Sequence, residues 1–135
     1  MQIDHKTKVL ERLYYLFDTH HIFWILSGSM SLKIQGVDVE PRDIDILTDK
    51  TNVGKIDHIL SDYRVQAPAY SSTETYRSYY GIYKIDNVKV EIMGEFQYRL
   101  IDGSWSIPNQ QKKIVEIKFD EMILPVLALE RELQE

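Results

Sequence analysis

The sequence contains no cysteine, and only six glycine and four proline residues occur among its 135 positions. The absence of cysteine excludes a disulfide framework, a thiol nucleophile and a zinc site built from thiolates. No apolar run is long enough for a membrane-spanning helix, and no signal-type apolar segment follows the charged N-terminus. We therefore expect a soluble, cytoplasmic protein that does not associate with membranes.

Three widespread catalytic motifs are also absent from the chain. The sequence has no G-x-x-x-x-G-K-S/T phosphate loop, no G-x-S-x-G elbow and no H-E-x-x-H helix. Their absence removes the common readings as a P-loop ATPase, an α/β-hydrolase or a zinc protease. The formal net charge of −5 argues against tight nonspecific binding to nucleic acid, which usually requires a basic surface.

The hydrophobic content of 44% provides enough apolar material for one core, and we expect a single domain over residues 1–135. Apolar periodicity predicts a helix, a strand, a short helix, a second strand and a third helix in the first half. This order favours an α/β or α+β sandwich over a helical bundle. The expected helices are 4–19, 52–63 and one starting near Pro125; the expected strands are 22–26, 43–47, 79–85, 88–93, 96–101 and 114–119.

A turn of small residues, Ser27-Gly28-Ser29, ends the first apolar run. Glycine permits a tight turn, and we expect a short helix to begin here, capped by Ser27 or Ser29 and ending near Gly36. The unpaired backbone N–H groups at such a helix start attract phosphate. Small-residue turns before helices are common, so this feature alone does not identify a phosphate site.

Two carboxylates, Asp43 and Asp45, alternate with Ile44 and Ile46 in the second predicted strand. Positions two residues apart on a strand lie on one side, roughly 6.6 to 6.8 Å from each other. Both carboxylates are therefore able to converge on one cation, and hard oxygen ligands favour magnesium. For an isolated D-x-D pair, a solvated strand end is the commoner explanation.

A third carboxylate, Glu91, favours a metal site over a solvated strand end. Residues 88–93 alternate so that Lys89 and Glu91 share one face of a strand, and Asp86-Asn87 before them suits a two-residue hairpin turn. If this strand neighbours the one that carries the two aspartates, all the carboxylates meet near the Gly28 turn. Such a cluster would repel itself without cations, and divalent metals make chemical sense of it.

Residues 69–83 are rich in tyrosine. One or two of these rings could stack on a nucleotide base or on an acceptor ring, because an aromatic face binds flat rings of many kinds. The alternative, which we favour, is that tyrosine is simply a common strand residue. The tyrosines are Tyr70, Tyr76, Tyr79, Tyr80 and Tyr83.

Taken in order, these motifs resemble the DNA polymerase beta-like nucleotidyltransferase superfamily, in particular its small single-domain members, the minimal nucleotidyltransferases. The matching residues are Gly28-Ser29, then Asp43-Ile44-Asp45-Ile46, then Val90-Glu91-Ile92. The resemblance implies an α+β fold, a mixed β-sheet with helices packed mainly on one face. Glu91 departs from the pattern, because many members carry aspartate there.

The resemblance also implies an activity: transfer of a nucleoside monophosphate from a nucleoside triphosphate, with ATP expected, to a hydroxyl-bearing acceptor, with release of pyrophosphate. Asp43, Asp45 and Glu91 would be catalytic and would hold two Mg²⁺ ions, for which Mn²⁺ could substitute. Gly28, Ser29 and Lys89 would contact the nucleotide phosphates. The acceptor would be a protein or a small molecule, as in the antibiotic-modifying transferases of the superfamily.

A non-enzymatic alternative stays open from the sequence. Some minimal nucleotidyltransferases act with a helical partner protein, and related transferases carry a helical acceptor-binding domain that we do not find after the core here. The expectation is therefore that the acceptor comes from elsewhere or that a partner completes the site. The alternative function is that of a non-catalytic nucleotide-binding or antitoxin-like protein; a homodimer also remains open.

Overall fold

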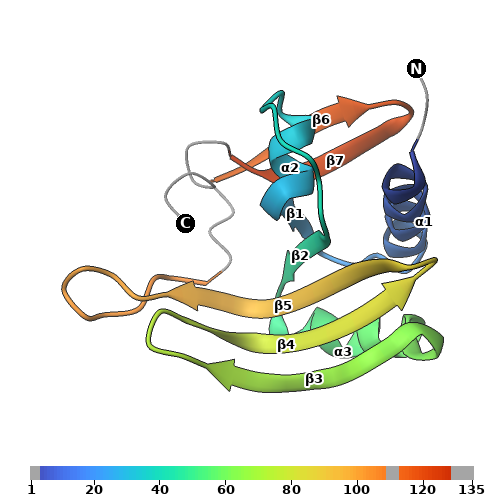
Figure 1. Cartoon of the computed structure of the whole chain (residues 1–135). Coiled ribbons are helices and arrows are strands. Elements are labelled where there is room, and N and C mark those ends of the chain that lie inside the picture. The colour runs from blue at the N-terminus through green and yellow to red at the C-terminus, as the bar shows by residue number, and fades with distance from the viewer. Residues whose placement is uncertain (1–3, 109–112, 129–135) are drawn as a thin grey trace.

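A seven-stranded sheet in the order β3-β4-β5-β2-β1-β7-β6 forms the centre of the computed structural model, which describes residues 4–108 and 113–128 (Figure 1). Three α-helices accompany it, so the predicted α+β class with a mixed sheet is confirmed. The helices are α1 (His5–Thr19), α2 (Gly28–Ile34) and α3 (Lys50–Ile59); the strands are β1 (Ile25–Ser27), β2 (Ile44–Thr48), β3 (Arg64–Ser72), β4 (Tyr76–Ile85), β5 (Val88–Tyr98), β6 (Ile114–Phe119) and β7 (Met122–Leu127).

The sheet is mixed because two of its pairings are parallel. β2 runs parallel to β5 and β1 runs parallel to β7, whereas the neighbouring strands elsewhere in the sheet are antiparallel. The β4–β5 hairpin turns at Asp86 and Asn87, whose φ angles of 49° and 67° are those of the two-residue turn predicted from the sequence. The hairpin places β5 beside β4, and the other edge of β5 pairs with β2.

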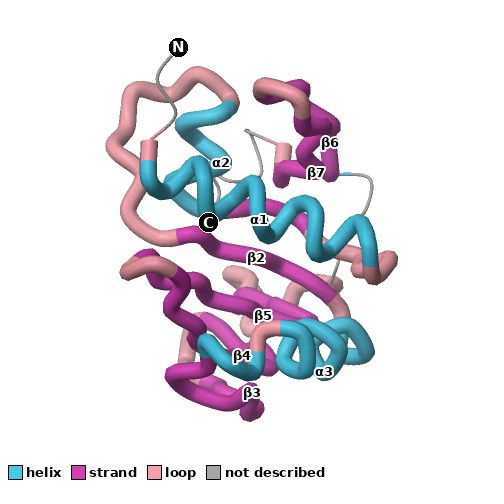
Figure 2. Tube along the Cα trace, turned by 90° about the vertical axis from the view of Figure 1, so that its right-hand side faces the viewer, coloured by secondary structure: helices cyan, strands magenta, loops and turns pink. Residues whose placement is uncertain are grey.

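The main core lies between the sheet and helices α1 and α3, which cover the same face (Figure 2). Side chains of β2 and β5 reach this core at alternate positions, and Ile44, Ile46, Val90 and Ile92 are all fully buried. Each such side chain contributes about 1.5–3 kcal/mol through its burial. Because side chains alternate along a strand, the residues between them point to the opposite face.

Carboxylates cap the N-termini of two helices, α1 close to its expected start and α3 two residues before the expected start at position 52. Asp4 accepts a hydrogen bond from the backbone N–H of Thr7 at 2.8 Å, and Asp49 accepts one from Asn52 at 2.8 Å. The third helix is shorter than the expected 52–63, because α3 ends at Ile59 and a 3₁₀ turn, Ser61–Tyr63, follows it. None of the helices in the described part of the chain is long and apolar enough to cross a membrane.

The expected helix start near Pro125 is wrong, because Pro125 lies inside β7. The alternation of Met122, Leu124 and Val126, all fully buried, makes this segment a strand with one face in the core. Proline cannot donate a hydrogen bond within a sheet. It is accommodated here because β7 pairs with β1 at one position, Leu26 with Val126.

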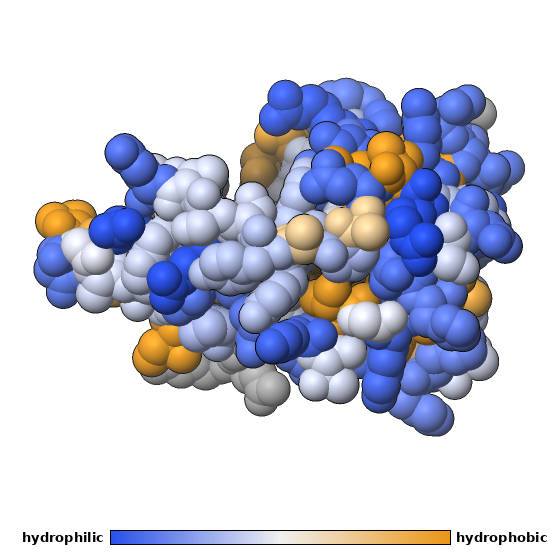
Figure 3. Space-filling model, turned by 90° about the horizontal axis from the view of Figure 1, so that it is seen from below, coloured by the Kyte–Doolittle hydropathy of each residue, from blue (hydrophilic) through white to orange (hydrophobic). Residues whose placement is uncertain are grey.

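Strand β3 was not predicted. Of the expected strand 96–101, residues 96–98 are the end of a longer β5, and residues 99–101 lie beyond it. β3 lies at the edge of the sheet, and all of its residues except Pro68 are exposed, so it lacks the apolar alternation by which strands are recognised. Figure 3 shows the molecule from below, the side on which β3 lies in Figure 1. This surface is mostly hydrophilic or neutral in hydropathy, with scattered apolar groups. Pro68 and the register shifts around it interrupt this edge, and such interruptions disfavour pairing with other chains.

We predict that Gly94→Ala destabilises the protein by about 1–3 kcal/mol through overpacking. A β-carbon at Gly94, in β5, would lie 2.2 Å from the Cγ2 atom of Val53 in α3. Urea denaturation should show that adding Val53→Ala recovers part of this loss. Gly54→Ala is the matched control, because a β-carbon there meets nothing within 4 Å and should stabilise α3. A Gly94→Ala protein as stable as the wild type would contradict this packing.

Candidate functional site

Asp45 and Glu91 lie side by side on the face of the sheet opposite α1 and α3. The parallel register of β2 with β5 pairs Asp45 directly with Glu91, at the strand spacing of about 4.8 Å. The residues on either side of Asp45 and of Glu91 are buried in the core, which turns both carboxylates to the other face; these neighbours are Ile44, Ile46, Val90 and Ile92. The condition set by the sequence, that the two strands be neighbours with aligned polar faces, is met.

Gly28 presses directly against the Asp45 carboxylate. Its φ of +70° is in the left-handed region, and a β-carbon built there would stand 2.0 Å from Asp45 Oδ2. The first residue of α2 is therefore glycine for two reasons, its backbone conformation and the space that the carboxylate occupies. The close approach brings the predicted phosphate turn and the predicted metal ligand into one site.

Glu91 is held by two further side chains. The Tyr80 hydroxyl donates to Glu91 Oε1 at 2.5 Å, and Lys89 Nζ lies 3.2 Å from the same oxygen. A hydrogen bond shared with Asp45, and then those from Tyr80 and Lys89, lower the pKa of Glu91 against the opposing effect of burial. These contacts favour the ionised form of Glu91.

Tyr80 stays a neutral hydrogen-bond donor. Burial raises its pKa above the ordinary value, and the hydrogen bond to Glu91 and the negative charges of Asp45 and Asp43 act in the same direction. The adjacent charge of Glu91 raises the pKa of Lys89, which keeps this lysine protonated. The arrangement thus places one fixed donor and one cation on the Glu91 carboxylate.

The other predicted residues lie close by with less direct contacts. Asp43 immediately precedes β2, and its charge reaches Tyr80 and Lys89. The Ser29 hydroxyl accepts a hydrogen bond from the backbone N–H of Arg42 at 3.0 Å, which ties α2 to the segment that enters β2. Gly28, Ser29, Asp43 and Asp45 are thereby gathered around one turn.

Within residues 4–108 and 113–128, no group of three or more histidine, cysteine, aspartate or glutamate side chains is close enough to hold a metal ion. The three carboxylates of Asp43, Asp45 and Glu91 were expected to converge. In the structure Asp45 and Glu91 stand at paired positions, and Asp43 lies near them. Glu91 accepts a hydrogen bond from the neutral Tyr80 hydroxyl, and the Lys89 cation beside it offsets its negative charge. The donor set still has the chemistry of a hard-cation site, because Asp45 and Glu91 stand at paired positions of neighbouring strands and carboxylate oxygens are ligands that Mg²⁺ favours.

The sequence did not single out Tyr80, although the necessary pattern is present. From the hairpin turn at Asp86-Asn87, the antiparallel register places Ile82 opposite Glu91 and Tyr80 opposite Met93, on the carboxylate face. The other tyrosines of β4 mostly face α3: Tyr83 is fully buried and donates to Asp57 at 2.8 Å, and the ring of Tyr79 lies under Lys50.

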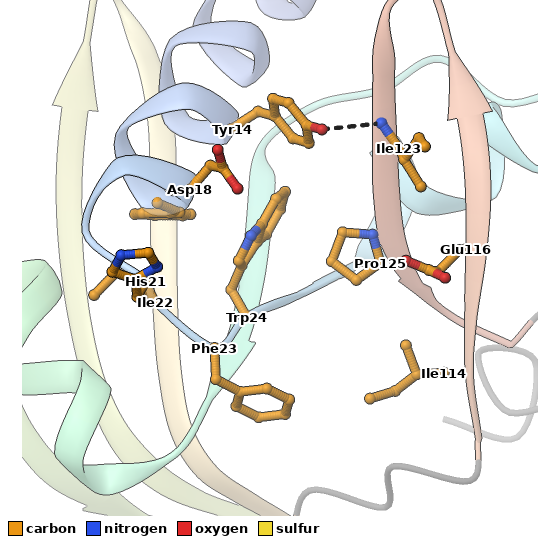
Figure 4. A pocket seen from close by; sticks show the side chains of 11 residues that line it. Tyr14, Asp18, His21, Ile22, Phe23, Trp24, Ile114, Glu116, Ile123 and Pro125 are labelled. Atoms are coloured by element: carbon orange, nitrogen blue, oxygen red, sulfur yellow. Dashed lines mark hydrogen bonds between the residues drawn. The ribbon is translucent and has the colours of Figure 1, made fainter.

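A separate cavity of about 510 Å³ lies between α1 and the β6–β7 hairpin (Figure 4). Trp24 projects into its middle, and the Tyr14 hydroxyl accepts a hydrogen bond from the backbone N–H of Ile123 at 3.3 Å. Asp18 and Glu116 add negative charge on opposite sides. None of the predicted site residues lines this cavity, so it is distinct from the Asp45–Glu91 site.

Comparison with known proteins identifies the family. A family model described as aminoglycoside-2″-adenylyltransferase matches residues 9–134. The chain belongs to this family. Membership in the aminoglycoside-2″-adenylyltransferase family confirms the predicted nucleotidyltransferase superfamily and the predicted enzyme class. No curated protein sequence shows significant similarity to the chain.

Two solved structures resemble this member of the aminoglycoside-2″-adenylyltransferase family. A Thermotoga maritima protein assigned as a nucleotidyltransferase is 38% identical, with a TM-score of 0.91 over 99% of this chain and 84% of that one. The lincosamide antibiotic adenylyltransferase LnuA, solved with lincomycin bound, is 17% identical, with a TM-score of 0.66 over 99% of this chain and 86% of that one. The second likeness concerns the fold alone.

We predict that Gly28→Ala costs about 2–4 kcal/mol of stability, because it combines a strained φ with a collision against Asp45. Gly103→Ala is the matched control: its φ is +90°, but a β-carbon there meets nothing within 4 Å, so only the strain of about 1–2 kcal/mol remains. Denaturation midpoints should show Asp45→Ala partly rescuing Gly28→Ala. Equal losses at Gly28 and Gly103 would contradict the close approach.

Proposed function

We propose that the protein is a metal-dependent nucleotidyltransferase that moves a nucleoside monophosphate from a nucleoside triphosphate, preferentially ATP, to a hydroxyl-bearing acceptor. The observation that carries the proposal is the register of β2 with β5, which sets Asp45 beside Glu91 with Gly28 packed on Asp45. This arrangement occurs in a chain of an adenylyltransferase family, which supports ATP as the donor.

The nucleotide phosphates would be held at the start of α2. The backbone of Gly28 and Ser29 faces the Asp45 side of the site, and backbone N–H groups at a helix start suit phosphate oxygens. Asp43, Asp45 and Glu91 would hold two Mg²⁺ ions, or Mn²⁺ in their place. When bound, such ions neutralise the triphosphate and the departing pyrophosphate.

Glu91 would act as the general base. The acceptor hydroxyl oxygen forms a bond to the α-phosphorus, the bond from that phosphorus to the α,β-bridging oxygen breaks, and pyrophosphate leaves with the electron pair. The hydroxyl proton passes to a Glu91 carboxylate oxygen. Tyr80 and Lys89 fix the orientation of the Glu91 carboxylate, so that one of its oxygens would face the acceptor hydroxyl. Lys89 would also contact a phosphate of the nucleotide.

Incubation with each radiolabelled nucleoside triphosphate, Mg²⁺ and a set of acceptors tests the activity. We expect Asp45→Asn and Glu91→Gln each to lower the transfer rate about 100-fold or more, a barrier increase of roughly 3 kcal/mol. Asp38→Asn is the matched control, because it makes the same chemical change in an exposed loop residue. Unchanged rates in both site variants would refute the proposal, and nucleotide binding without any transfer would favour the non-catalytic alternative.

Tyr80→Phe tests the support of Glu91 separately. The variant removes the hydroxyl that donates to Glu91 Oε1, and hydrogen bonds to charged groups are worth about 1.5–3 kcal/mol. We expect kcat to fall roughly tenfold, with the KM for the triphosphate unchanged. The acidic limb of the pH–rate profile should move to higher pH, because the hydrogen bond that is lost lowers the pKa of Glu91 in the wild type. Tyr79→Phe, on the opposite face of the same strand, should behave as the wild type. If Tyr80→Phe keeps the wild-type kcat and pH profile, Tyr80 does not support Glu91 in catalysis.

A further inference from the structure

A cavity of about 340 Å³ lies directly beside Glu91, over strands β3, β4 and β5. Its size is within the range of small-molecule sites. Glu91 and Tyr80 form its end nearest the carboxylate pair, and Tyr76 and Phe96 form an aromatic wall farther along. The rings of Tyr76 and Phe96 stack with centroids 5.6 Å apart and an interplanar angle of 26°.

The order of the strands assigns this cavity to the acceptor. Gly28 follows β1, Asp45 lies on β2 and Glu91 lies on β5, so the phosphate turn, the metal-ligand candidate and the base follow one another across the sheet. The cavity continues in the same direction over β4 and β3, on the side of Glu91 away from Gly28. A molecule in it would present its hydroxyl to Glu91 from the side opposite the triphosphate.

The charges around the cavity are unsuited to a polycation. Glu91 is the single carboxylate among the described residues that line it, and this carboxylate already contacts Lys89 at 3.2 Å. The single lining cation, Arg77, is occupied: its Nε donates to Gln97 at 2.8 Å, and its guanidinium lies 4.2 Å from the centroid of the Trp105 ring. An amino sugar with several ammonium groups would meet one carboxylate in this cavity, Glu91, whose charge Lys89 already offsets, and one cation, Arg77, that repels it.

The remaining lining is suited to a neutral ligand. Ser71 and Ser78 offer hydroxyl groups, whereas the Thr73 hydroxyl is used in hydrogen bonds with the backbone of Thr75 and Tyr76. The exposed Tyr76, with Phe96 stacked on it, offers an apolar face for a flat group. Resting on the proposed transferase function, we infer that the acceptor is a neutral, hydroxylated small molecule with an aromatic or similarly flat apolar group. A polycationic amino sugar, which the family description suggests, is not the acceptor of this chain.

Two probes separate these classes: 4-nitrophenyl β-D-glucopyranoside, a neutral aryl glycoside, and neamine, a polycationic amino sugar. With radiolabelled ATP and Mg²⁺, we expect transfer to the aryl glycoside with a kcat/KM about tenfold or more above that for neamine. Tyr76→Ala should raise the KM for the aryl glycoside about tenfold, the effect of losing one stacking contact, and leave the KM for ATP unchanged. Tyr76→Phe should retain the wild-type KM.

Tyr70→Ala is the matched control. Tyr70 is 55% exposed and Tyr76 is 43% exposed, but Tyr70 packs on Tyr79 and does not line the cavity. Preference for neamine would overturn the inference while the transferase function stands. Transfer to neither probe, or equal losses in Tyr70→Ala and Tyr76→Ala, would also overturn it. The proposed function is tested independently by measuring pyrophosphate release without an acceptor, since water can take the acceptor's place. Release that is lost in Asp45→Asn supports the transferase function whatever the acceptor is.

Discussion

The parallel pairing of β2 with β5 is the constraint on which the site depends. It sets Asp45 next to Glu91, and it does so through the same two-residue period that buries Ile44, Ile46, Val90 and Ile92 on the opposite face. A shift of one position would turn the carboxylates into the core and the isoleucines into solvent. Hydrophobic burial, the largest favourable contribution to folding, therefore fixes the register of the polar site as well.

Much of this arrangement could be predicted from local signals. The alternation around Asp43 and Asp45, the turn at Asp86-Asn87 and the glycine at position 28 each have a short-range physical cause. Together with the resemblance to a known superfamily, they were sufficient for the fold class, and they indicated that the carboxylates meet if the two strands are neighbours; the pairing of Asp45 with Glu91 came from the structure. The sequence could not supply the orientation of the Glu91 side chain, because that orientation depends on Tyr80 and Lys89 in three dimensions.

The errors have a common origin in long-range context. Strand β3 carries exposed residues and a proline, and it is a strand because β4 offers it an edge. Pro125 sits in β7 because its apolar neighbours are buried against the core, although proline locally suggested a helix start. The tyrosines divide between two faces, Tyr83 with the helices and Tyr80 with the carboxylates, which composition alone does not reveal.

The pairing of Leu26 with Val126 has a kinetic consequence. Strand β1 lies between β2 and β7, so the centre of the sheet is complete only when segments from opposite ends of the described chain have met. Closing such a long loop costs entropy before any contact repays it, and proteins dominated by distant contacts fold slowly. The β4–β5 hairpin forms from adjacent residues, so folding should begin there, and the joining of β7 to β1 should be a late step.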